Sequence, residues 1–252
     1  HLSTRRQRQM CIRDSNVYSA NGEDGIIKKL FSDLNITDGI VCEFGAANGL
    51  DDSNTAALWK QNYQAVLIES DSGRFDGLKN NTSEYDVECI HTMVRGGRKK
   101  GIKGASFNVE KDSNEYNDET WIEQREQEDA EPTIDNILEK SKFNITSDNF
   151  SLMSIDIDSY DYYVFNSIEK YFPKVLIFEV SSGYAFDEYF LDESKGCSIK
   201  AAYELGIEKG YKMICHCGNV IFVRNDLTHK LPDYDYSLKN LHQGSYQFQN
   251  PK

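Results

Sequence analysis

Carboxylates stand at the ends of three apolar runs in this sequence, where buried strands are expected to end. Glu43 lies in the run GIVCEF at 39–44, Glu69 follows Ala65-Val-Leu-Ile68, and Asp156 lies near the end of the run 150–157. Open parallel sheets bind ligands at the carboxyl ends of their strands, so we expect these acids to gather at one edge of a sheet. Acids so placed bind cationic groups, accept hydrogen bonds from hydroxyl groups or take up a proton.

The turn after the first strand, Gly45-Ala-Ala-Asn-Gly49, indicates which ligand these acids meet. A dinucleotide-binding fingerprint starting at Gly45 needs glycine at positions 47 and 50, which hold Ala47 and Leu50. An NAD-dependent oxidoreductase is therefore disfavoured. Glu69 lies 24 residues past Gly45, where an acid accepts hydrogen bonds from both ribose hydroxyls of a nucleoside. The pattern suits S-adenosylmethionine; the alternative is a generic α/β turn with surface acids.

Alternating strands and helices must position these residues. Short apolar strands separated by helices predict an α/β fold, with a mostly parallel sheet covered by helices on both faces. Gly218-Asn219 is a hairpin-turn signal that adds an antiparallel strand at the C-terminal end. We expect strands over 39–44, 65–68, 87–94, 150–157, 175–180, 211–217 and 220–224, and helices over 24–34, 53–61, 72–80, 133–140, 160–171 and 197–209.

Composition excludes several classes of protein. The net charge is −13, and a field of that sign repels the phosphates of nucleic acids. The sequence has no apolar run long enough to span a bilayer and no secretory signal. Six cysteines in 252 residues do not make a disulfide scaffold, so we expect reduced core thiols and a cytoplasmic location.

The chain divides into four parts by composition. Residues 1–15 carry four arginines without apolar periodicity, and RRQRQMCIRDS resembles a translated sequencing adapter, so we treat them as a non-native tail. Residues 16–227 form a single domain, and 228–252 a C-terminal extension. The segment 95–131 is a polar insertion, basic at its start and acidic at its end. We expect either a solvated loop or a lid over the substrate.

An ordered set of motifs links the chain to a known family. Ser19-Ala-Asn-Gly-Glu-Asp-Gly25, VCEFGAANG, SNT at 53–55 and LIESD at 67–71 resemble the FkbM-type methyltransferases, as do TIDNILEK, SIDIDSYDYYVF, FEV at 178–180 and GYKMICHCGNVIFVR. The resemblance covers about residues 18–227. It implies a Rossmann-like class I methyltransferase fold, a seven-stranded sheet with the last strand antiparallel, and S-adenosylmethionine as methyl donor.

The same resemblance assigns roles to individual residues. It implies that the methionine part of the donor is held by Glu43, Gly45, Asn48 and Gly49. Asn54 would contact the donor, and Glu69 would bind its ribose. Asp24, in the opening loop, would either help to close the donor site or cap the following helix.

The acids after the fourth strand are the first candidates for catalysis. Asp156 and Asp158 point to opposite faces unless the strand has already ended. Asp158-Ser-Tyr-Asp161 also has the form of a helix N-cap with an acid three residues later. We therefore assign Asp158 to capping and Asp156 to the active site as general base, with His216 and Glu179 in reserve. A hydroxyl activated on Mg²⁺ at Asp156 and nearby carboxylates is the alternative.

Cys215-His216-Cys217 is not expected to form a metal site, because on a strand the cysteines and the histidine face opposite ways. The sequence therefore predicts an S-adenosylmethionine-dependent methyltransferase, directed at a hydroxyl of a sugar or glycan acceptor. The small-molecule or glycan acceptor is implied by the family alone. The alternative is a non-catalytic module that binds an adenosyl ligand.

Overall fold

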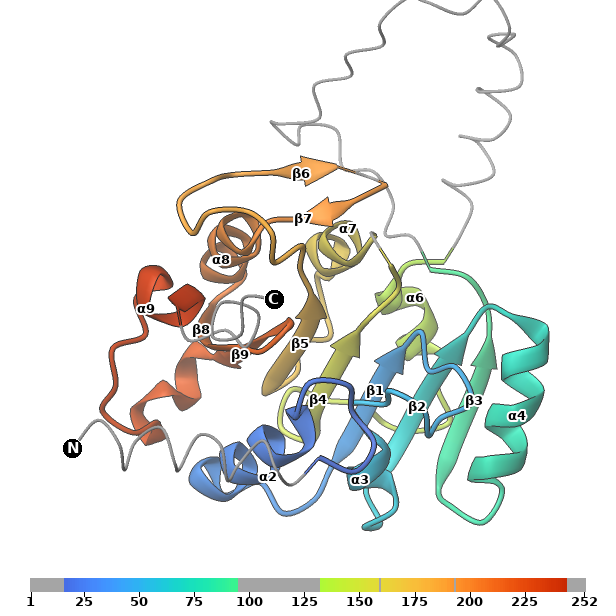
Figure 1. Ribbon diagram of the computed structural model, residues 1–252. Helices are drawn as coiled ribbons and strands as arrows, with labels where there is room; N and C mark the ends of the chain where they lie inside the picture. The colour runs from blue at the N-terminus through green and yellow to red at the C-terminus, as the bar shows by residue number, and fades with distance from the viewer. Residues whose placement is uncertain (1–15, 95–131, 159, 193, 244–252) are drawn as a thin grey trace, which may run out of the picture.

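Figure 1 shows the computed structural model, which describes residues 16–94, 132–158, 160–192 and 194–243. The predictions for the tail 1–15 and the insertion 95–131 lie outside the described residues, as does the end of the C-terminal extension.

One seven-stranded sheet forms the centre of the domain, in the order β3-β2-β1-β4-β5-β9-β8. All strand pairs are parallel except those that β9 makes with β5 and β8. This is the predicted class I methyltransferase arrangement, with the last strand antiparallel, and the prediction is confirmed. The strands are β1 (Ile40–Phe44), β2 (Gln64–Glu69), β3 (Val87–His91), β4 (Phe150–Ile155), β5 (Val175–Glu179), β8 (Tyr211–His216) and β9 (Asn219–Arg224).

Helices cover both faces of the sheet because its strands are apolar on both sides. In β1, Ile40, Cys42 and Phe44 pack into one core and Val41 packs into the other, as the two-residue period of a strand requires. The first core lies beneath α6 (Ile134–Glu139), α7 (Asp161–Ser167), α8 (Ile199–Glu208) and α9 (Leu238–Gln243). The second lies beneath α2 (Glu23–Leu34), α3 (Ala56–Trp59) and α4 (Ser72–Thr82).

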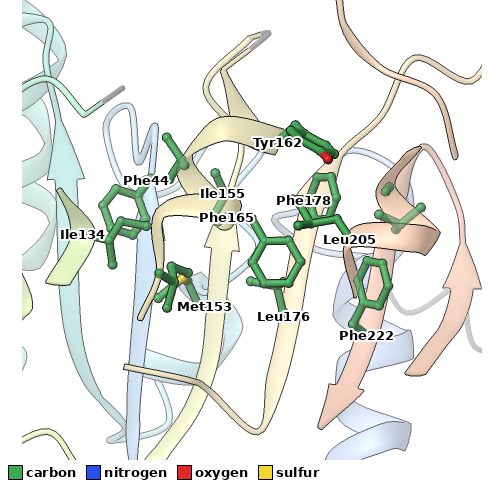
Figure 2. Close-up of a cluster of buried hydrophobic side chains, with 14 of the residues drawn as sticks. Phe44, Ile134, Met153, Ile155, Tyr162, Phe165, Leu176, Phe178, Leu205 and Phe222 are labelled. Carbon is green, nitrogen blue, oxygen red and sulfur yellow. The ribbon is translucent and has the colours of Figure 1, made fainter. Parts of the chain in front are cut away.

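The first core is built around aromatic rings (Figure 2). The rings of Phe178 and Phe222 stack with their centroids 5.7 Å apart, and Phe165 contacts both. A β-carbon added to Gly206 of α8 would lie 2.2 Å from the Phe222 ring. Only glycine at this position lets α8 approach the sheet so closely.

Helix α7 is shorter than the predicted helix 160–171 and ends at Ser167. The reason is a competing acceptor: the carboxylate of Asp135 accepts the backbone N–H groups of Glu169, Lys170 and Tyr171 at 2.7, 3.1 and 3.2 Å. These groups would otherwise continue the helix, so the chain turns away after Ser167. The third strand also ends early, at His91 rather than at residue 94.

The structure adds elements that carry no sequence periodicity. A two-residue pair, β6 (Leu191–Asp192) and β7 (Gly196–Cys197), docks beyond the end of β5, where Ser181 N–H donates to the Cys197 carbonyl at 2.8 Å. A 3-10 helix, η1 (Asn225–Lys230), crosses the predicted boundary at 227. The described part of the extension then packs onto the domain, with Leu241 of α9 buried in the first core.

Candidate active site

A cleft of about 750 Å³ opens at the carboxyl edge of the sheet, over the ends of β1, β4 and β5. The strand order reverses between β1 and β4, which is where open α/β sheets bind their ligands. Among the described residues, the guanidinium of Arg74 lines the cleft. The carboxylates that line it are those of Glu43, Asp51, Asp52, Asp156, Asp158 and Glu179.

Gly45 is required for the shape of this cleft. Its φ of +72° lies in the left-handed region, and an added β-carbon would lie 1.9 Å from the backbone oxygen of Asp156. The chain leaving β1 therefore passes directly against the chain leaving β4. Glycine is used here for the close approach of two backbone segments.

Asn48 and Gly49 shape the turn that follows. The Asn48 Oδ1 accepts the backbone N–H groups of Leu50 and Asp51 at 3.0 Å each, and Asn48 lines the cleft. Gly49 has a φ of +83°, and its added β-carbon would lie 2.7 Å from Leu78 of α4. Gly49 therefore allows the turn to pack against α4, whereas Asn48 lines the cleft.

Glu43 holds the segment that the SNT motif forms. One carboxylate oxygen accepts the hydroxyls of Ser53 and Thr55 at 2.7 and 2.6 Å, and the other accepts the Asn54 N–H at 2.7 Å. Burial raises the pKa of Glu43 to about 7, against the hydrogen bonds from these residues, which lower it. Asn54 itself is buried behind Glu43 and instead lines a separate cavity beside α2.

Glu69 is buried and is bound by backbone. Its Oε2 accepts the Ala47 N–H at 2.7 Å, and its Oε1 accepts the N–H groups of Ser70 and Asp71 at 2.8 and 2.7 Å. Glu69 thus ties the turn after β1 to the turn after β2. These three bonds engage both carboxylate oxygens of Glu69. The ribose contact that the family resemblance implies for Glu69 stays a prediction.

Asp24 does not cap α2, and its role in closing the donor site stays a prediction. Its Oδ2 accepts the backbone N–H groups of Val17, Tyr18 and Ser19 at 2.8, 2.7 and 3.3 Å, which folds the opening segment over α2. The residue at the N-cap of α2 is Gly22. Asp24 lines the cavity beside α2 together with Asn54, away from the acidic cleft.

Asp156 and Glu179 carry perturbed carboxyl groups in the cleft. Burial raises the pKa of Asp156 to about 6, and the charge of Asp158 raises it further, whereas a hydrogen bond from Asn219 lowers it. Burial also raises the pKa of Glu179 to about 7, with added repulsion from Asp156 and Asp158. Raised pKa values near neutrality are typical of groups that exchange protons at pH 7.

The capping role predicted for Asp158 is wrong. The N-cap of α7 is Tyr160, and no side chain among the described residues caps that end. Because β4 has already ended at Ile155, Asp156 and Asp158 both line the cleft instead of pointing to opposite faces. Asp158 has a φ of +53°, and the Asp161 carboxylate accepts the Ile157 N–H at 3.1 Å. Asp158 in this turn lines the cleft.

His216 lies behind the cleft, buried in β8. Its Nε2 is 2.9 Å from the hydroxyl of Ser182, which lines the cleft. The imidazole of His216, a reserve candidate for the general base, is therefore linked to the cleft by the hydroxyl of Ser182. The C-H-C motif is not assembled into a metal centre: among the described residues, no group of three or more His, Cys, Asp or Glu side chains is placed to hold a metal ion.

Two smaller cavities adjoin the acidic cleft. One of about 260 Å³ lies over β2 and β3 and shares Gly45 and Asp158 with the cleft; its apolar lining includes Phe44, Ile68 and Val94. The other, of about 230 Å³, lies beside the β6–β7 pair and shares Asp158 and Glu179. Asp158 lines all three cavities.

Several residues of this edge were missed in the sequence. Asn219 and Ser182 line the cleft, and Glu23 is fully buried beside it. Glu23 lies in the Asn-Gly-Glu-Asp-Gly motif, and Asn219 belongs to the hairpin-turn signal Gly218-Asn219. Their contact joins residues 196 positions apart, which no local pattern shows.

No protein-family model matches the sequence, and no curated protein matches it either. Among solved structures, the chain is similar to an S-adenosylmethionine-dependent methyltransferase from Clostridium acetobutylicum ATCC 824, at 9% identity and a TM-score of 0.46, over 84% of this chain and 94% of that one. The chain is also similar to a SAM-dependent methyltransferase from Aquifex aeolicus, at 8% identity and a TM-score of 0.41, over 78% of this chain and 86% of that one. It is similar as well to the glycopeptide N-methyltransferase MtfA complexed with sinefungin, at 8% identity and a TM-score of 0.42, over 83% of this chain and 87% of that one.

Likeness at these scores assigns no activity, and the resemblance to the FkbM family stays a prediction. The fold is instead established by the strand order and directions of the sheet itself. Within the described ranges, every helix is too short or too polar to cross a bilayer.

Proposed function

We propose that this chain is an S-adenosylmethionine-dependent methyltransferase that acts on a hydroxyl group of a sugar or glycan. The observation that carries the donor assignment is the charge of the cleft, where six carboxylates and one guanidinium of the described residues surround the point of strand reversal. The donor has two cationic groups, a sulfonium and an ammonium, and one carboxylate. A dinucleotide has two phosphates instead, which this lining repels.

The lining groups suit each part of this donor. Arg74 offers a cation to the donor carboxylate, and the carboxylates near Asp156 face its cations. Gly45, Ala47 and Asn48 line the cleft in the turn after β1. The apolar cavity of about 260 Å³ suits an adenine ring. When bound, the donor supplies a methyl group that is already activated by the positive sulfur.

The task left to the protein is to orient the acceptor and remove its proton. Asp156 is the proposed proton acceptor, because its pKa near 6 keeps it ionised at pH 7 while leaving it more basic than an ordinary aspartate. Glu179, on the neighbouring strand, lines the same cleft and is the second candidate. Binding of Mg²⁺ at Asp156 is the competing route, and a turnover that survives EDTA would exclude it.

An uncharged polyhydroxyl acceptor fits the side of the cleft toward β5. There the lining consists of the hydroxyls of Ser181 and Ser182 and the carboxylates of Asp158 and Glu179. Carboxylates accept hydrogen bonds from sugar hydroxyls, and they disfavour phosphorylated acceptors by repulsion. Among the described residues, Cys42, Cys89 and Cys197 form no disulfide, which supports the proposal of a reducing, cytoplasmic compartment.

Two experiments test this function in turn. In a thermal-shift assay, S-adenosylmethionine and S-adenosylhomocysteine should raise the melting temperature and NAD should not, because a ligand bound only by the folded state stabilises it. Incubation with methyl-labelled donor and a panel of neutral, amino and phosphorylated sugars should then label a neutral sugar. Donor binding without transfer to any member of a broad panel would favour the non-catalytic module.

A further inference from the structure

A cavity of about 540 Å³ beside α2 plays no part in the proposed chemistry. Among the described residues, none lines both this cavity and the acidic cleft. Its volume falls within the range of roughly 300–1,000 Å³ that is typical of small-molecule sites. Part of its lining is exposed, so a ligand can enter from solvent past Val17, Lys28, Ser32 and Gln61.

The buried part of the lining is mainly apolar. Its side chains come from α2, from α3 and from the segments that follow these helices: Ile27, Phe31, Ile36, Leu58 and Tyr63. The rings of Phe31 and Tyr63 lie with their centroids 5.9 Å apart, and the Tyr63 hydroxyl donates to the Ile36 carbonyl at 3.3 Å. A ligand with an apolar, preferably aromatic, body fits this lining.

Two buried acceptor atoms in the same lining have no hydrogen-bond partner. Asp24 is 6% exposed and Asn54 is 2% exposed. Within the described ranges, Oδ1 of Asp24 and Oδ1 of Asn54 form no hydrogen bond. Buried polar atoms in native proteins are nearly always bonded, because an unmade hydrogen bond costs free energy. Two such acceptors in one cavity therefore indicate a ligand that donates to them.

The other polar atoms of these two side chains are already bonded to the protein. Asp24 Oδ2 accepts the backbone N–H groups of residues 17–19, and Asn54 Nδ2 donates to the Ser154 hydroxyl of β4 at 3.0 Å. At the rim, Nε2 of Gln61 donates to a carbonyl of α3 at 2.6 Å. The two Oδ1 atoms are therefore left for the cavity, and these amide donors are occupied elsewhere.

We propose that the cavity beside α2 is a second ligand site, for a small molecule that carries a primary ammonium group on an apolar, preferably aromatic, body. A primary ammonium has three N–H donors and no acceptor, which suits the unbonded oxygens of Asp24 and Asn54. Its charge complements the Asp24 carboxylate, and hydrogen bonds between ionised groups are stronger than neutral ones. This site does not depend on the proposed methyl transfer.

Three probes that share a phenyl ring and a short spacer test the proposal on the full chain by calorimetric titration. They are 2-phenylethylamine, 2-phenylethanol and 3-phenylpropionate. We expect the dissociation constant of the amine to be at least about tenfold lower than that of the alcohol, because a charged donor replaces a neutral one. The carboxylate should bind most weakly, since Asp24 repels it.

Equal affinity for the amine and the alcohol would overturn the proposal, as would no binding of the amine at millimolar concentration. A preference for 3-phenylpropionate would overturn it too, and would make the exposed ammonium of Lys28 the anchor of an anion site instead.

Asp24→Asn keeps the size of the side chain and removes its charge, so the dissociation constant of the amine should rise by at least about tenfold. Asp33→Asn removes a carboxylate from the same helix outside the lining and should leave it unchanged, which makes it the matched control. If Asp24→Asn does not fold, Ala57→Phe decides, because a ring at this half-buried lining position fills the cavity. Unchanged amine binding in either folded variant would overturn the proposal.

A competition experiment separates this site from the proposed donor site. Binding of 2-phenylethylamine should persist when S-adenosylhomocysteine is present in excess, since the two cavities have separate linings. Displacement of the amine would overturn the proposal of a second site. Binding of the amine by a protein that does not bind S-adenosylhomocysteine would keep this site and reject the proposed donor.

Discussion

Gly45 and Asp156 bring the chain leaving β1 directly against the chain leaving β4: a β-carbon on Gly45 would lie 1.9 Å from the Asp156 backbone oxygen. Gly45→Ala must therefore push β1 and β4 apart or rotate the turn. With the left-handed φ of this residue added, we expect a loss of at least about 2 kcal/mol in the free energy of unfolding. Denaturant titration measures it.

The matched control for Gly45→Ala is Gly183→Ala, since an added β-carbon at Gly183 meets nothing within 4 Å. Its effect should stay within about 0.5 kcal/mol. Equal stability of the two variants would show that the approach of Gly45 to Asp156 is not part of the native packing.

Glu69 should matter for stability as well as for donor binding. Its carboxylate accepts three backbone N–H groups, so Glu69→Ala leaves all three without this acceptor. We expect a loss of about 1–3 kcal/mol in unfolding free energy. If its carboxylate also meets the ribose, the dissociation constant for S-adenosylhomocysteine should rise by roughly ten- to a hundred-fold.

Glu84→Ala, at an exposed glutamate just after α4, is the control for Glu69→Ala in both measurements. A Glu69→Ala protein that loses stability but keeps its affinity for S-adenosylhomocysteine would restrict Glu69 to joining the two turns. It would also remove the ribose role implied by the family resemblance.

The strand-end acids and the glycine turn could be predicted because each follows a short apolar run. The residues that form hydrogen bonds with these acids in the folded protein could not be predicted. Glu43 was expected to bind the donor, yet its oxygens are taken by Ser53, Asn54 and Thr55, residues that lie 10 to 12 positions away. The left-handed φ of Asp158 likewise carries no sequence signal, and the cap motif pointed to the wrong role.

The predicted C-terminal end of α7 was wrong because a distant side chain accepts the backbone N–H groups that follow the helix. Asp135 ends α7 by accepting three N–H groups from 34 to 36 residues further along the chain. The β6–β7 pair was missed because two-residue strands have no period to detect. The mostly parallel sheet was accessible because strands alternate with helices along the sequence, and the antiparallel strand was accessible from the hairpin-turn signal Gly218-Asn219.

Asp156→Asn should make the protein more stable at alkaline pH. The folded-state pKa of Asp156, about 6, lies above its ordinary value, so the folded state holds this proton more tightly than the unfolded state does. The stability gained from that proton is fully present below about pH 4 and is lost as the pH rises through 6. At pH 8 the variant should therefore be more stable than the unsubstituted protein, by about 1–3 kcal/mol.

Unfolding curves at pH 4 and pH 8 measure this difference, and the advantage of Asp156→Asn should be smaller at pH 4. An advantage of equal size at both pH values would mean that Asp156 titrates normally. In a transfer assay the same variant should lose about 10²–10⁴-fold in turnover, the usual contribution of a general base. Full activity would remove Asp156 from the mechanism.

Gly206→Ala tests the packing of the core beneath α8. Alanine normally stabilises a helix relative to glycine, but here its β-carbon would lie 2.2 Å from the buried ring of Phe222. We expect a net loss of about 1–3 kcal/mol, as for other overpacked sites. Glu204→Ala, at an exposed position of the same helix, should change stability little; a stabilised Gly206→Ala would contradict the packing of α8 on β9.

The most direct test of the central claim is calorimetric titration of the unsubstituted protein with S-adenosylhomocysteine, sinefungin and NAD at pH 7.5. Sinefungin carries an amine where the donor carries its methyl sulfonium, so an acidic cleft should bind it at least as tightly as S-adenosylhomocysteine. In Asp156→Asn that preference should fall, while affinity for S-adenosylhomocysteine should change little. Binding of NAD with no binding of either adenosyl amino acid would contradict the account.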